Sequence, residues 1–184
     1  TISDTAANIV TMLDSAATFV TGSTGNITVT GTTAAAADMV RIDGESAKLI
    51  DATSITTYTG VIGDIVAVAQ SAEISTAANY AATVDSGTAS VAQVNTLDAD
   101  TTGVISATVA EGDVATLQTL NDANGNNALN ITVAEASASA SDLEAVAGKT
   151  SVAVTATAVE TVTGHVADIL SATNNAGVHS HADH

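Results

Sequence analysis

Residues 131–148 read ITVAEASASASDLEAVAG, and residues 27–44 read ITVTGTTAAAADMVRIDG. Both stretches open with Ile-Thr-Val, pass through an Ala-rich run, place an Asp before a larger apolar residue and end on Gly. Their starts are 104 residues apart, which is four steps of 26. Self-similarity at a short fixed period is the sequence signature of a repeat architecture. The chain is therefore interpreted as an array of repeats.

The repeat unit is predicted to be a short strand followed by a short helix. Ile131 and Val133 alternate with a polar and a small residue, as in a strand with one buried face. Leu143 and Val146 are three residues apart, which is the spacing of one face of a helix. Elements this small cannot bury an apolar face alone, so neighbouring copies are expected to stack and share a core.

The predicted fold class is α/β, as a right-handed solenoid of short parallel strands and short helices with about six strand-helix units, layered as in leucine-rich repeat proteins. The hand follows because parallel strands joined by a helical crossover almost always connect in a right-handed sense. The expected boundaries are a partial repeat at 1–26, repeat 1 with an insertion at 27–54, repeat 2 at 55–81, repeat 3 at 82–104, repeat 4 at 105–130, repeat 5 at 131–153, repeat 6 at 154–178 and a His-containing tail at 179–184.

Four details of the units are expected as well. Residues 1–26 should hold a helix whose strand lies upstream, and residues 45–54 should add an extra helical turn. Val166 and Ile169 should anchor the sixth helix in the core. One parallel ladder should line the interior with small aliphatic residues, namely Val29, Val84, Ala107, Val133 and Ala156.

The composition suits thin, closely stacked layers. Hydrophobic residues make up 46% of the 184 residues, but aromatic residues only 2%. A core must then be built from Ala, Val, Ile and Leu. Proline is absent, which leaves every backbone N–H free to join a ladder.

The charge is strongly acidic. Asp and Glu number 20 against 3 Lys and Arg, which gives a formal net charge of −17. Nucleic acid is excluded as a partner because phosphate contacts need Lys and Arg, and no apolar run approaches the ~20 residues of a membrane-spanning helix. A saline or calcium-rich medium would suit such a surface, although the charge could also act only to keep the chain soluble. Cysteine is absent, which excludes disulfides and thiolate chemistry.

Calcium is a possible cofactor at the turns between repeats. The candidate ligands are Asp98, Asp100, Asp122, Asn124 and Asn126. The Asp-x-Asn-x-Asn spacing over residues 122–126 resembles the start of a calcium loop, but the distal acidic ligand is missing. Ordinary Asx turns explain the same residues.

A second candidate metal site lies in the C-terminal segment VHSHADH, where His179, His181 and His184 could bind a transition metal. The alternative is a loose chain end with no metal. His165 is expected on a helix surface.

Outward-facing hydroxyls could form a ligand-binding array on one sheet face. The candidate positions are Thr28, Thr30, Thr56, Thr83, Ser106, Thr108, Thr132, Thr155 and Thr157, with Tyr58, Asp85 and Ala134 interrupting the array. Such a face could bind ice, a glycan or a mineral. Threonine is also simply a good strand residue.

Catalysis is not expected. The chain contains no nucleophile-elbow context for a Ser-His-Asp set and no phosphate-binding Gly-rich loop with its Lys. The acidic residues also lack an apolar pocket that would shift their pKa values.

Three stretches resemble a known class of repeats: DTAANIVTMLDS at 4–15, TASVAQVNTLDADTTGVISATVAEGDVATLQTL at 88–120 and VAVTATAVETVTGHVADILSA at 152–172. They are similar to repeats of giant secreted cell-surface proteins of marine cyanobacteria, including the giant protein required for swimming motility, and to repeats of other large bacterial surface and calcium-binding proteins. The calcium-binding nonapeptide GGxGxD is absent.

This resemblance implies an extracellular, non-catalytic, structural role in a filament, a surface layer or an adhesive stalk. The alternatives are a calcium-stiffened adhesin linker and a Thr-array solenoid that binds ice or another ligand. Self-association head to tail or side by side is expected, because the ends of a solenoid expose strand edges.

Overall fold

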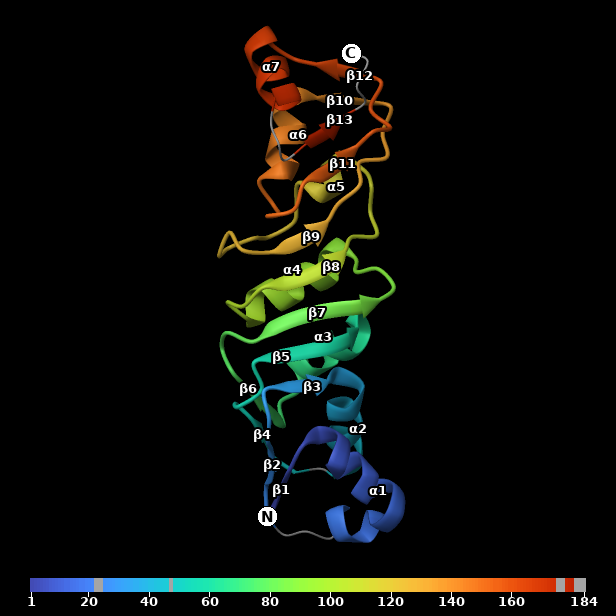
Figure 1. Cartoon of the computed structure of the whole chain (residues 1–184), viewed down its shortest axis with the longest axis vertical. Helices are drawn as coiled ribbons and strands as arrows, with labels where there is room; N and C mark the ends of the chain where they lie inside the picture. The colour runs from blue at the N-terminus through green and yellow to red at the C-terminus, as the bar shows by residue number, and fades with distance from the viewer. Residues whose placement is uncertain (22–24, 47, 175–177, 181–184) are drawn as a thin grey trace. The chain divides into compact units, whose positions relative to one another are not determined.

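The computed structural model describes residues 1–21, 25–46, 48–174 and 178–180, with side chains described except at 16–21, 173–174 and 179–180. The described part is α/β, with seven helices and short strands that pair in parallel (Figure 1). It divides into two compact units. The first contains residues 1–87 and 99–103, and the second contains residues 88–98 and 104–184.

The first unit contains a four-stranded parallel ladder in the order β1 (Ile2–Asp4), β2 (Ile27–Val29), β4 (Ile50–Ala52) and β6 (Ile74–Thr76). The register places the first residue of each strand beside the first residue of the next, so that four isoleucines form one column. All four isoleucines are buried. Paired strands start 23 to 25 residues apart in sequence, and each strand adds one isoleucine to the same buried column.

A second parallel ladder of this unit consists of β3 (Thr33–Ala35), β5 (Thr57–Val61) and β7 (Ala81–Ser86), which lie one above another in Figure 1. Its inward column is Ala34, Tyr58 and Ala82, all buried. The chain passes from the first ladder to the second through a short turn. At Gly31 that turn has φ 101°, a conformation that glycine adopts at little cost.

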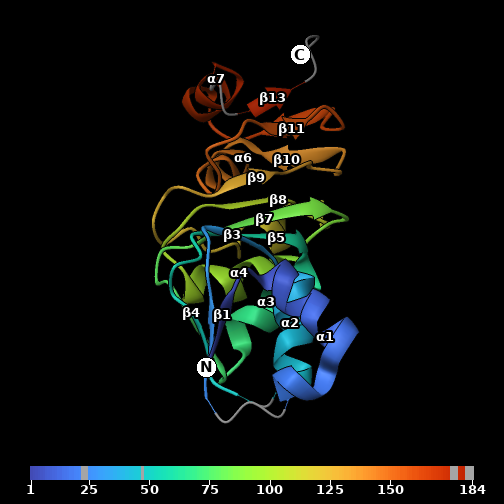
Figure 2. The ribbon, with the colours of Figure 1, turned by 60° about the horizontal axis from the view of Figure 1, so that its bottom comes forward.

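Three helices complete the first unit: α1 (Ala6–Thr21), α2 (Ala36–Ser46) and α3 (Ile62–Gln70). Each contacts the next, and Figure 2 shows them side by side. Met39 and Ile42 of α2, like Ile65 and Val68 of α3, are buried at a spacing of three residues. A spacing of three residues places both members of each pair on one apolar face of the helix.

The second unit has the same kinds of element. Its helices are α4 (Val91–Asp100), which belongs to this unit through residue 98, α5 (Val114–Leu117), α6 (Ala140–Ala147) and α7 (Val166–Asn174). Its strands are β8 (Ile105–Thr108), β9 (Ala128–Asn130), β10 (Ser137–Ser139), β11 (Val154–Ala156), β12 (Thr161–Thr163) and β13 (Val178–Ser180). The parallel pairs are β8 with β9, β10 with β12, and β11 with β13. Partners lie 22 to 24 residues apart.

Two expectations about the first 54 residues are wrong. The strand that precedes α1 is β1, within the chain, rather than upstream of it. The predicted helical turn in residues 45–54 is instead strand β4, which pairs with β2. Ile50 and Ala52 are buried on either side of exposed Asp51, and this period of two is that of a strand.

The expectation of one ladder is also wrong. Val29 lies in β2 and Val84 in β7, and these strands belong to different ladders. In the first unit the chain forms one strand in each ladder, with a turn between the two strands. The predicted unit contained only one strand before its helix. Val29, Ala107, Val133 and Ala156 are buried as predicted, whereas Val84 is only half-buried.

The helix anchors of the fifth repeat are confirmed, since Leu143 and Val146 are buried. In the sixth repeat the prediction fails at Val166, which is 82% exposed, while Ile169 is half-buried. Val166 is the first residue of α7, and α6 is the helix that contacts α7 within the described residues.

Substitution at two adjacent residues tests the placement of β4. Ile50→Ala should lower the free energy of unfolding by about 2–5 kcal/mol, because it empties a fully buried position in the isoleucine column. Leu49→Ala is the control, since Leu49 is 57% exposed, and it should change stability by less than about 0.5 kcal/mol. Urea unfolding followed by circular dichroism measures both, and a larger loss in Leu49→Ala would contradict the register.

Candidate functional site

Buried polar side chains hold the turns that precede several strands. In the first unit, Thr101 lies four residues before Ile105, where the next strand begins, and is 2% exposed. Its hydroxyl donates to the backbone oxygen of Tyr80 at 2.6 Å and accepts from the backbone N–H of Gly103 at 3.0 Å. The turn at Gly103 packs so closely on the backbone at Tyr80 that a Cβ would clash there.

Asn127 and Thr150 play the corresponding role in the second unit, each four residues before an apolar residue, Ile131 or Val154, that faces the core. Asn127 is fully buried, and its Oδ1 accepts from the N–H of Ile105 at 3.2 Å. The Thr150 hydroxyl donates to the backbone oxygen of Leu129 at 2.9 Å and accepts from its N–H at 2.8 Å. Sequence reasoning missed Thr101, Asn127 and Thr150, although each stands four residues before a buried aliphatic residue, which was a readable signal.

Two of the predicted calcium ligands, Asp98 and Asp122, lie around Asn127. The Nδ2 of Asn127 donates to Asp98 Oδ1 at 2.9 Å, and the N–H of Ala123 donates to Asp98 Oδ2 at 3.3 Å. Asp122 Oδ1 accepts from the backbone N–H groups of Asn126 and Asn127 at 3.1 and 3.3 Å. These carboxylates therefore order the turn at residues 121–127 by hydrogen bonding.

The other predicted ligands are placed elsewhere. Asp100, like Asp98, lies in the last turn of α4 rather than in a turn between repeats, and it accepts a hydrogen bond from the Tyr80 hydroxyl at 2.7 Å. Asn124 is exposed beside Gly125. Within the described ranges, no three His, Cys, Asp or Glu side chains are grouped so that they could hold a metal ion. Calcium binding stays a hypothesis.

The histidine tail falls mostly outside the described residues, since His181 and His184 lie beyond residue 180. The backbone of His179 lies in β13, beside Thr155 of β11. His165 is exposed, immediately before α7.

The predicted hydroxyl array does not lie on one sheet face. Thr28 is in the first ladder, beside Ser3 and Asp51, so its outward column mixes hydroxyls with a carboxylate. Thr83 lies in the second ladder, on β7. Tyr58 was expected to point outward but is fully buried. The alternation of inward and outward side chains along β5 is therefore shifted by one residue from the prediction.

The two tyrosines form a buried pair in the first unit. The rings of Tyr58 and Tyr80 meet edge to face, with centroids 5.1 Å apart and an angle of 83° between the planes. The Tyr80 hydroxyl donates to Asp100, whereas the Tyr58 hydroxyl has no hydrogen-bond partner in the described part of the chain. Burial raises the pKa of both phenols, and the negative charge of Asp100 raises each pKa further.

Glutamates of the sequence TVAE stabilise the start of a preceding helix in the second unit. Glu111 accepts a hydrogen bond at 3.0 Å from the N–H of Val91, the first residue of α4. Glu135 accepts one at 3.2 Å from the N–H of Val114, the first residue of α5. A carboxylate at a helix N-terminus satisfies an open N–H and interacts favourably with the helix dipole. These contacts link residues 20 and 21 positions apart in the chain.

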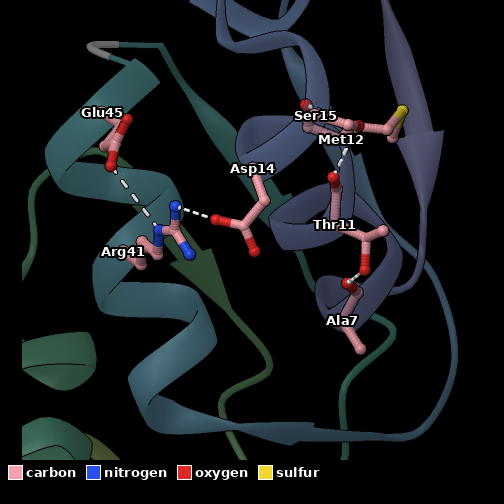
Figure 3. A network of polar contacts seen from close by, with 7 residues as sticks. All are labelled: Ala7, Thr11, Met12, Asp14, Ser15, Arg41 and Glu45. Atoms are coloured by element: carbon pink, nitrogen blue, oxygen red, sulfur yellow. Dashed lines mark hydrogen bonds and ion pairs between the residues drawn. The ribbon is translucent and has the colours of Figure 1, made fainter.

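A surface ion network joins two helices of the first unit (Figure 3). Arg41 of α2 contacts Asp14 of α1 at 2.5 Å and Glu45 of its own helix at 3.5 Å. Exposed ion pairs of this kind contribute at most about 1 kcal/mol. Figure 3 also shows the hydroxyls of Thr11 and Ser15 bonded to carbonyls one helical turn earlier.

Comparisons with family models, curated proteins and solved structures found no match. None of the described helices combines the length and the apolar character needed to cross a bilayer.

The buried tyrosine pair predicts a sharp alkaline limit to stability. Because the pKa of each phenol is raised in the folded state, the stabilisation is complete below the unfolded value of about 10 and is lost as the pH rises above it. Tyrosinate absorbance should therefore increase only together with loss of the circular dichroism signal.

Tyr58→Phe and Tyr80→Phe serve as controls in this titration, since each should halve the absorbance change. Ionisation of both tyrosines near pH 10 in a protein that keeps its circular dichroism signal would contradict the burial of the pair.

Removal of a helix-capping carboxylate should cost stability. Glu135→Gln weakens the acceptor for Val114 and should lower the free energy of unfolding by about 0.5–2 kcal/mol. Glu160→Gln is the matched control, because Glu160 stands in the related sequence TAVE but is exposed. Denaturant unfolding compares the two variants, and equal losses would argue against a specific role for Glu135.

Proposed function

We propose that the chain is a solenoid segment with a mechanical or spatial role outside the cell, as part of a filament, a surface layer or an adhesive stalk. In this proposal the repeats supply length and stiffness, and no chemical step takes place on them.

The observation that carries the proposal is the repeated parallel pairing within each unit. Strands pair with strands 22 to 25 residues further along the chain, in both ladders of the first unit and in all three pairs of the second. A chain built in this way can be lengthened by adding repeats without a change of design. This pattern supports a role as an extended mechanical element.

The inter-repeat contacts support the same role. Glu111 and Glu135 join one repeat to the next through backbone N–H groups, and Asn127 and Thr150 hold neighbouring turns. All of these contacts depend on backbone groups that any repeat can offer. The residue that supplies the backbone group can therefore vary in sequence without loss of the contact.

The cell-exterior location rests on the resemblance of the repeats and on the acidic surface. A net charge of −17 is compatible with a medium rich in salt or calcium. We also propose association of copies head to tail or side by side, since β1 is an edge strand of its ladder and edge strands can pair with another chain. A glycan or another surface ligand could then be contacted by the assembled array.

Small-angle X-ray scattering tests the architecture. A compact chain of 184 residues has a radius of gyration of about 16 Å, and a stacked array should exceed this value clearly at low concentration. Self-association should add a further, concentration-dependent increase. A concentration-independent value near that of a compact sphere would contradict the proposal.

The same preparation provides the test of location. Antibodies against the purified chain should label intact producing cells, and mild external protease should remove the label. Labelling only after the cells are permeabilised would contradict an extracellular role.

A further inference from the structure

The turn at residues 121–127 contains four asparagines in different settings. Asn127 is fully buried, and its side chain bonds to Ile105 and Asp98. Asn121 receives and donates hydrogen bonds through its backbone. Asn124 is exposed, and its side chain makes no hydrogen bond to the residues that the structure describes. Its amide is therefore free to rotate toward the following residue.

That following residue is Gly125, and the pair is the one Asn-Gly sequence in the chain. Gly125 has φ 65°, and no atom lies within 4 Å of the position where a Cβ would stand. Gly125 thus has neither a side chain nor a close non-adjacent neighbour on that side of its Cα. Its N–H donates to the backbone oxygen of Asp122 at 3.2 Å, which is a long hydrogen bond.

We infer that Asn124 is a site of spontaneous deamidation in the folded protein. The deprotonated backbone nitrogen of Gly125 attacks Cγ of Asn124, the new N–C bond closes a five-membered succinimide, and the amide nitrogen leaves as ammonia. Water then adds to one of the two ring carbonyls and opens the ring. The product is aspartate or isoaspartate, and no oxidant or reductant takes part.

The product has two physical effects on the turn. It introduces a negative charge next to a segment that already contains Asp122 and contacts Asp98, so repulsion between carboxylates increases. Isoaspartate also lengthens the backbone by one carbon between residues 123 and 125. The longer backbone disturbs the hydrogen bonds from the N–H groups of Asn126 and Asn127 to Asp122, so the altered turn holds Asn127 less firmly.

The experiment is an ageing series on the intact folded chain in mildly alkaline buffer at physiological temperature. Anion-exchange chromatography should resolve a form with one additional negative charge, and peptide mass spectrometry should map the change to residue 124. Methylation by isoaspartyl methyltransferase should label the same peptide. The aged form should melt at a lower temperature than the fresh protein.

Two variants and one internal control sharpen the test. Asn124→Gln should abolish the early charge variant, because its longer side chain disfavours ring closure. Gly125→Ala should slow the formation of this variant, because a Cβ crowds the attacking nitrogen and disfavours the positive φ of residue 125. Asp43–Gly44, a chemically related pair inside α2, should stay unmodified, since the Asp43 carboxylate accepts from the Ser71 hydroxyl and the helix constrains the backbone.

Two results would overturn the inference. One is an early charge variant that maps to another asparagine or that forms equally fast in Asn124→Gln. The other is an Asn124 that stays intact in the folded chain over the time in which a short peptide of the same turn sequence deamidates.

Discussion

The structure depends on the in-register parallel pairing of strands that lie about two dozen residues apart. In the first unit this register places Ile2, Ile27, Ile50 and Ile74 in one buried column. A slip of one residue in any rung would turn its isoleucine to solvent and an outward residue such as Thr28 or Asp51 into the core. The buried isoleucine column therefore fixes the register of the ladder, and the ladder keeps the isoleucines aligned. The helices pack against this sheet.

Much of this organisation could be predicted from sequence because it depends on periodicity. The comparison of residues 27–44 with 131–148 predicted the strand at Ile27–Val29, short helices and buried anchors such as Leu143 and Val146. The strand predicted at Ile131 is wrong, since the structure has only an isolated bridge there, between Thr132 and Thr155. The comparison did not predict that a repeat in the first unit contains two strands before its helix. Strands of three residues carry too little alternation to be separated from a turn. The sequence pattern therefore did not reveal β3, and it predicted an extra helical turn where β4 lies.

The polar residues show a different limit of sequence reasoning. Asp98, Asp100 and Asp122 were predicted as calcium ligands. The partners that the structure gives Asp98 and Asp100 could not be read from the sequence, because those partners lie 20 to 29 residues away. The structure uses Asp98 to hold Asn127 and Asp100 to hold Tyr80. Turns between short parallel strands bring backbone N–H and C=O groups near the core, and buried polar side chains such as Asn127 satisfy them.

The buried tyrosine pair also determines what optical spectroscopy can detect. The chain has no tryptophan, and its two tyrosines, Tyr58 and Tyr80, both lie in the first unit. Intrinsic tyrosine emission consequently reports on that unit alone, while far-ultraviolet dichroism reports on the backbone of both. A denaturation curve recorded with the two signals in parallel thus distinguishes cooperative melting of the whole chain from stepwise melting of its halves.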